Sequence, residues 1–206
     1  MAYNDNFKEI FENLKDGDGL GFYKGGIFKH FIPAATGYEC NHCGICYYVE
    51  RNENEIKFRF SEQTFSGGKF DWISIYKINN NYITDDAYFT KQNKIYYRSL
   101  KVAMTPEQIA RGREDAEGQV GKVYGFLTLI FGLKFWNFMP SWLSNWLGKR
   151  LKNAERVCSQ HVEFNYIYAG VLTPNFKKDP FKDPGEIMYL GIFKPAATVS
   201  NICHKI

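Results

Sequence analysis

Three residues that lie far apart in the sequence carry the reactive groups of a cysteine hydrolase: Cys158, His42 and Glu62. In such an enzyme a thiolate attacks the substrate, an imidazole transfers the proton, and a third polar group orients the imidazole. The histidine stands upstream of the cysteine. Sites of this class are defined by geometry and by roles, and not by chain order, so we predict a thiol-based site wherever the fold brings these residues together.

Cys158 begins an amphipathic stretch, 158–170, in which Val162 and Tyr166 predict a helix. A thiol in the first helical turn lies near unpaired N–H groups and the positive end of the helix dipole, both of which lower its pKa. The same N–H groups could hold an oxyanion. The alternative is an inert packed thiol, and the polar residues Ser159–His161 favour the reactive interpretation.

His42 and Glu62 belong to consecutive strand-like runs, Cys43–Glu50 and Ile56–Glu62. Consecutive antiparallel strands can place a side chain of one beside a side chain of the other. A histidine next to an apolar strand is usually a packed residue, so its predicted role depends on the thiol partner. Asp71 is the competing carboxylate, and Glu62 is preferred because Asp71 follows the next turn.

Hydrophobic periodicity and turn residues predict an α+β chain. We expect helices over 4–14 and 105–118 and from Cys158 onward, and strands over 20–23, 43–50, 56–62, 72–76 and 94–102. The second helix has the clearest start, because Thr105 is followed by Pro106 and by Gln108, the spacing of a capping box. A turn is expected at Asn79–Asn81.

Composition is typical of one globular domain over residues 1–206. The chain has 45% hydrophobic and 17% aromatic residues, enough to bury one sizeable core without a partner, and it carries no signal for a particular oligomer. Its net charge of +4 is spread out, apart from a local concentration at Lys149, Arg150, Lys152 and Arg156. We therefore expect weak attraction to acidic surfaces and no nucleic-acid partner.

Five cysteines and the lack of a secretory leader pattern favour a reducing, cytoplasmic location. Three of them, Cys40, Cys43 and Cys46, surround His42 and suggest a metal site. Zinc sites of this type need a second ligand pair, which is lacking. In a strand His42 and Cys46 would also point away from Cys43. We therefore predict packed thiols, with no metal and no cofactor.

The segment Phe126–Leu147 is an aromatic-rich insertion with Lys134 as its one charge. It approaches the length of a membrane span, but Pro140 and several polar residues interrupt it. It also holds three tryptophans, which suit an interface better than a hydrocarbon core. We expect two short helices that cover the sheet; the alternative is a lip that caps substrate or makes a peripheral membrane contact.

Several segments, in order, resemble the permuted NlpC-type papain-like proteins, in which the histidine precedes the cysteine, the reverse of papain. This group includes bacterial YiiX-like and YebB-like amidases and, more distantly, lecithin:retinol acyltransferase. The matching segments are Gly17–Phe22, Thr36–Tyr38, Asn41–Ile45, Ser61–Thr64 with Gly67-Gly68, Gly121–Gly125, Val157–Val162 and Pro184–Ile187. Departures are Gly125 for an acidic residue and Gln160-His161 for Glu-Leu.

The resemblance implies a circularly permuted papain-like fold, an antiparallel sheet packed against helices. It implies Cys158 as nucleophile, His42 as general base and acid, Glu62 as the group that orients the ring, and Asp18 and Tyr124 as substrate-binding residues. The expected function is hydrolysis of an amide, of peptide or peptidoglycan type, through an acyl-thioester. The alternatives are a lipid acyltransferase or thioesterase at a membrane surface, and a non-catalytic binding module on the same fold. The substrate is accordingly a small molecule, a peptide or a lipid.

Overall fold

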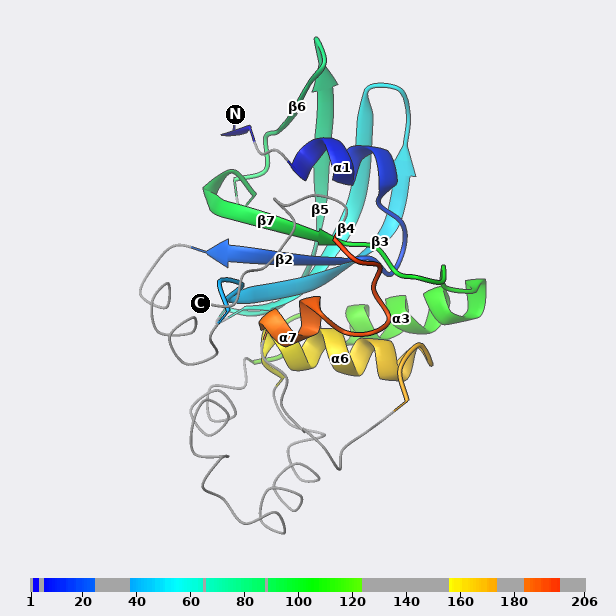
Figure 1. Cartoon of the computed structure of the whole chain (residues 1–206). Helices are drawn as coiled ribbons and strands as arrows, with labels where there is room; N and C mark the ends of the chain where they lie inside the picture. Colours follow the sequence, from blue (N-terminus) through cyan, green and yellow to red (C-terminus); the bar gives the residue numbers. More distant parts are fainter. Residues whose placement is uncertain are drawn as a thin grey trace.

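The computed structural model describes residues 2–3, 6–24, 38–64, 66–87, 89–123, 156–173 and 184–196. These residues form an α+β structure, in agreement with the predicted class (Figure 1). Its elements are β1 (Ala2–Tyr3), α1 (Asn6–Asn13), β2 (Gly19–Lys24), β3 (His42–Arg51), β4 (Glu55–Thr64), β5 (Gly67–Ile78), β6 (Asn81–Thr84), the short 3-10 helix η2 (Phe89–Lys91), β7 (Gln92–Arg98), α3 (Pro106–Gly118), α6 (Cys158–Tyr168) and α7 (Pro184–Met188).

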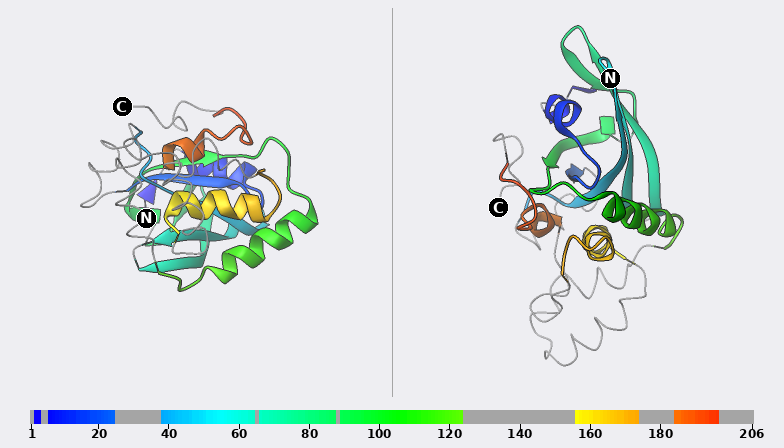
Figure 2. Two further views of the ribbon diagram at one scale, coloured as in Figure 1. Left: turned by 90° about the horizontal axis from the view of Figure 1, so that it is seen from below. Right: turned by 90° about the vertical axis from the view of Figure 1, so that its right-hand side faces the viewer.

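The strands form one antiparallel sheet in the order β1-β6-β5-β4-β3-β2-β7. Strands β2 to β6 follow one another as neighbours, whereas β7 returns to pair with β2 at the far edge. The sheet curls strongly, as Figures 1 and 2 show. The strands that carry His42 and Glu62, β3 and β4, lie inside the strand order and have a paired neighbour on each side.

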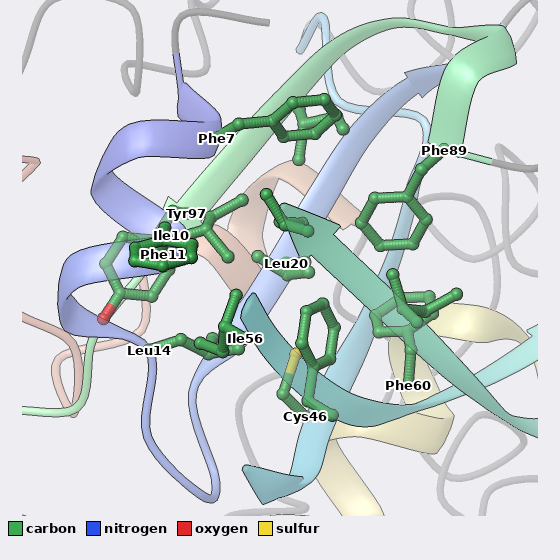
Figure 3. Close-up of a cluster of buried hydrophobic side chains, with 14 of the residues drawn as sticks. Phe7, Ile10, Phe11, Leu14, Leu20, Cys46, Ile56, Phe60, Phe89 and Tyr97 are labelled. Atoms are coloured by element: carbon green, nitrogen blue, oxygen red, sulfur yellow. The ribbon is translucent and has the colours of Figure 1, made fainter. Parts of the chain in front are cut away.

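Helix α1 lies on the inner side of the curled sheet (Figure 2) and packs against β6 and β7. Its Phe7, Ile10 and Phe11 are buried, and so is Leu14 directly after it, as the apolar face of the predicted helix requires. They join aromatic and aliphatic side chains of the strands in a first core cluster (Figure 3). Cys46 of β3 belongs to this cluster.

The opposite face of the sheet is covered by α6 and α7, and α3 packs beside α6 (Figure 1). A second core cluster forms there, and β3 contributes Cys43, Ile45 and Tyr47 to it. Because side chains alternate along a strand, neighbouring residues of β3 pack in different clusters, one on each face of the sheet. The predicted alternation of Cys43 and Cys46 is confirmed.

The predicted elements agree with the structure in most places. The capping box of α3 is present, with the Thr105 side chain accepting from the Gln108 N–H and Gln108 accepting from the Thr105 N–H. The expected turn contains Asn79 and Asn80, both at positive φ. Sequence reasoning missed the short strands β1 and β6, and it made β5 too short.

The segment Phe126–Leu147 lies outside the described residues, so its interpretation as a cover, a lip or a membrane contact stays a prediction. Among the residues that the structure describes, no helix combines the length and the apolar character needed to cross a bilayer.

Asp18, directly before β2, forms hydrogen bonds that link β2 to β3 and to the end of β7. Its carboxylate accepts hydrogen bonds from the N–H groups of Leu100 and Lys15 and from the Tyr97 hydroxyl, at 2.8–2.9 Å. Its own backbone carbonyl accepts from the Cys46 N–H at 2.9 Å. Burial raises the pKa of Asp18 to about 6, although the three hydrogen bonds oppose this rise. At neutral pH the group is therefore an ionised, internally bonded carboxylate.

We expect Asp18→Ala to lower the free energy of unfolding by about 2–3 kcal/mol, because buried donors that bond the carboxylate would lose their acceptor. Urea denaturation measures this change. Asp71→Ala is the matched control, since Asp71 is exposed on β5 and should change stability by less than about 0.5 kcal/mol. An equal, small effect of both substitutions would contradict the role given to Asp18.

Candidate active site

The register of β3 and β4 brings His42 and Glu62 together. Gly44 pairs with Glu62 in the antiparallel ladder, so Glu62 is the diagonal neighbour of His42 on the same face. Gly44 leaves no room for a larger residue, because an added Cβ would lie 2.3 Å from Cζ of Phe60 and 2.5 Å from the Ser61 carbonyl oxygen. From its place opposite Gly44, the Glu62 carboxylate reaches the imidazole.

The contact between these two residues is short and buried. His42 Nε2 lies 2.6 Å from Glu62 Oε2, and the residues are 7% and 4% exposed. Glu62 thereby fixes the orientation of the ring and occupies one of its two nitrogens.

Cys158 is the first residue of α6, which packs over β3 and β4. One half-buried and one buried contact hold this end of the helix. Just before it, Arg156 makes a bidentate pair with Asp115 of α3, at 2.7 and 2.9 Å. One turn into the helix, His161 Nε2 lies 2.7 Å from the hydroxyl of Ser61, the residue before Glu62. The backbone at Cys158 is therefore fixed by contacts before it and after it in the sequence.

Asn165 and Tyr166 fix the rest of α6. Asn165 accepts a hydrogen bond from the Tyr47 hydroxyl of β3 at 2.6 Å and donates to the Gly112 carbonyl of α3 at 2.8 Å. The Tyr166 hydroxyl donates to the Gly17 carbonyl at 2.7 Å. Both side chains are fully buried, so the helix has little freedom to slide along the sheet.

The Cys158 sulfur interacts with the His42 ring and with both the thiol and the backbone of Cys43. The bond to the Cys43 thiol and the nearby His42 charge lower the pKa of Cys158 well below that of an ordinary thiol, against the opposing effect of burial. Burial alone would lower the pKa of His42, but the Cys158 and Glu62 charges and hydrogen bonds raise it to about 9. Both shifts favour a thiolate–imidazolium pair over the two neutral groups.

The structure places the residues predicted for the triad together and the competing carboxylate elsewhere. The structure brings Cys158, His42 and Glu62 into one chain of contacts. Asp71, the competing carboxylate, is exposed and pairs across the ladder with Phe60, away from the histidine contact. Glu62 is the carboxylate that reaches the ring.

Of the two predicted substrate-binding residues, only Asp18 lies in the described part of the chain. Asp18 is 1% exposed, and its carboxylate is bonded to the backbone and to Tyr97, so its environment is that of a structural residue and not of a substrate ligand. The motif that carries it was recognised correctly as a turn into a strand, but the carboxylate turns inward. Tyr124 lies outside the described residues.

The cysteines near His42 divide between the two faces of the sheet, Cys40 and Cys43 in one core cluster and Cys46 in the other. Cys40 donates to the His42 carbonyl at 3.2 Å. No group of three or more metal-ligating side chains converges anywhere in the described part of the chain. Burial, with Asp18 and Asp16, raises the pKa of Cys46 well above its ordinary value, in contrast to Cys158.

Sequence reasoning missed three contributors to this site. Cys43 was assigned a packing role only, although its adjacency to His42 is the signal that could have placed it beside the nucleophile. The contact of His161 with Ser61 and the ion pair of Arg156 with Asp115 join residues that are distant in sequence. No local sequence pattern predicts such contacts.

Comparisons of the chain with protein-family models and with curated proteins find no match. The resemblance to permuted papain-like proteins therefore stays a prediction from the motifs.

We expect iodoacetamide to alkylate Cys158 at pH 6–7, where an ordinary thiol with a pKa of about 8.5 is mostly protonated. Cys46 should react far more slowly, because its pKa is raised and its side chain is buried. Peptide mass spectrometry after timed labelling measures both rates. His42→Ala should shift the labelling profile of Cys158 to higher pH, since the imidazolium that stabilises the thiolate is gone.

The matched control for this labelling experiment is Asp71→Ala, which removes a charge from the same sheet without touching the pair. Identical profiles for Cys158 in the wild type and in His42→Ala between pH 6 and 9 would show that the two groups do not interact.

Proposed function

We propose that this protein is a cysteine hydrolase that cleaves an amide bond through an acyl-thioester, on a circularly permuted papain-like fold. The observation that carries the proposal is the buried chain of contacts from the Cys158 sulfur through the His42 ring to the Glu62 carboxylate, 2.6 Å from the ring. A nucleophile, a proton carrier and an orienting group in hydrogen-bond contact are the parts that such a reaction needs.

In the acylation step the Cys158 thiolate attacks the carbonyl carbon, and the carbonyl oxygen becomes an oxyanion. The first N–H groups of α6 lack carbonyl partners within the helix and point to its N-terminal end, so they are suited to stabilise this charge. The His42 imidazolium then gives its proton to the departing nitrogen. The C–N bond breaks, an amine leaves, and a thioester with a neutral imidazole remains.

In the deacylation step the neutral His42 takes a proton from water as the water oxygen attacks the thioester carbonyl. The tetrahedral intermediate expels the Cys158 thiolate and releases a carboxylic acid. Imidazolium and thiolate are restored together. Glu62 holds the ring through both steps and stabilises its charged form.

The raised pKa of His42 supports an amide over an activated ester as the substrate. An amine leaves only if it is protonated, and a ring with a pKa of about 9 stays protonated at neutral pH. A thioester or phenyl ester needs no such acid. The lipid acyltransferase alternative depends on the segment 126–147, which lies outside the described residues.

The direct experiment is reaction of the full chain with an acylating probe, p-nitrophenyl acetate, followed by competition with peptide amides, peptidoglycan fragments and lipid esters. We expect a burst of nitrophenol and an acetyl group on Cys158, found by mass spectrometry. His42→Ala should lower the rate by about 10²- to 10⁴-fold, because general acid–base catalysis is lost. Glu62→Gln should retain the thiol but reduce turnover.

Asp71→Asn is the matched carboxylate control and should leave the rate unchanged, because Asp71 is exposed on the neighbouring strand β5. Competition by lipid esters and not by amides would replace the amide proposal with the acyltransferase. No acylation of Cys158 by the probe, in a protein whose Cys158 still alkylates, would leave a non-catalytic binding module.

A further inference from the structure

Cys43 is a second thiol beside the reactive sulfur. It lies next to His42 on β3, and its thiol interacts with Cys158 at the start of α6. Both residues are buried, at 0% and 4% exposure, and neither is in a disulfide. Helix α6 packs directly over β3, so the two cysteines lie on facing elements of the fold.

Such a pair has the requirements of a redox site. A sulfur that is largely thiolate at neutral pH reacts with peroxides, whereas a protonated thiol does not. The resulting sulfenic acid condenses with a thiol if one is within reach. Closing a disulfide requires the sulfurs to approach to about 2.05 Å, and the interaction of the two side chains places them side by side for this step.

We propose that Cys158 and Cys43 form a reversible disulfide when a peroxide oxidises Cys158. The Cys158 thiolate attacks one peroxide oxygen, the O–O bond breaks, and the sulfur becomes a sulfenic acid as hydroxide leaves and is protonated to water. The Cys43 thiol then attacks the Cys158 sulfur, the S–O bond breaks, and a second water leaves. Two thiols and one hydrogen peroxide thus give one disulfide and two waters.

The disulfide protects the nucleophile. Without a second thiol, a sulfenic acid is oxidised further to sulfinic acid, which a simple thiol reductant does not reverse. With Cys43 beside it, Cys158 is held in a form that dithiothreitol restores. This inference needs only the reactive thiolate and its neighbour, and it stands whether or not the protein hydrolyses amides.

The test treats the full chain with hydrogen peroxide, blocks the remaining thiols and maps linked peptides without reduction. We expect a Cys43–Cys158 linkage, loss of iodoacetamide labelling at Cys158, and recovery of most of that labelling after dithiothreitol. In Cys43→Ser, recovery should fall by about tenfold or more, because the sulfenic acid proceeds to sulfinic acid. Both readouts are masses, so they do not depend on turnover.

Cys46→Ser is the matched control, since Cys46 lies on the same strand but packs on the opposite face of the sheet. It should form the linkage and recover as the wild type does. A linkage of Cys158 to another cysteine, or sulfinic acid on Cys158 at equal rates in the wild type and Cys43→Ser, would overturn the proposal. If the Cys43 variant does not fold, the linked peptides of the oxidised wild type are the test: a Cys43–Cys158 linkage supports the proposal, and its absence overturns it.

Discussion

The buried charge pair between Cys158 and His42 is the interaction around which the site is organised. A thiolate and an imidazolium each lose hydration when they are buried, so they persist as ions only where hydrogen bonds and opposite charge outweigh that loss. Here the Cys43 thiol and backbone bond the sulfur, and the Glu62 carboxylate bonds the ring. The structure therefore stabilises ions that are reactive at neutral pH, where separate thiol and imidazole groups would be mostly uncharged.

The scaffold meets the geometric demand of this pair with two independent constraints. Within the sheet, the antiparallel register of β3 and β4 fixes His42 against Glu62, because a slip of one residue would turn the carboxylate to the other face. Across the layers, buried polar contacts of α6 with β3, β4 and α3 fix the position of Cys158. These contacts bury donors and acceptors that would be costly to leave unpaired, so they select one placement of the helix.

The sequence was informative about local features and about chemistry that one strand or helix carries. The capping box at Thr105, the helix that starts at Cys158 and the two strands bearing His42 and Glu62 were all predictable from periodicity and end signals. What could not be predicted was which way a polar side chain turns within the fold. Asp18 sits in a recognisable turn motif, yet its carboxylate faces the interior, and Cys43 became a partner of the nucleophile because a helix from the far end of the chain packs above it. Such outcomes depend on tertiary packing between segments distant in sequence.

The most direct test of the charge pair is titration of the His42 ring by NMR in the full chain. The ring should titrate near pH 9, above the ordinary value of 6.5, and Cys158→Ser should lower its pKa, because the thiolate charge that favours the imidazolium is removed while burial still disfavours it. His161 provides the contrast in the same spectra, since burial and the nearby Arg156 lower its pKa to about 4. A His42 pKa that is the same in the wild type and in Cys158→Ser would contradict the charge pair and, with it, the thiol chemistry proposed for this site.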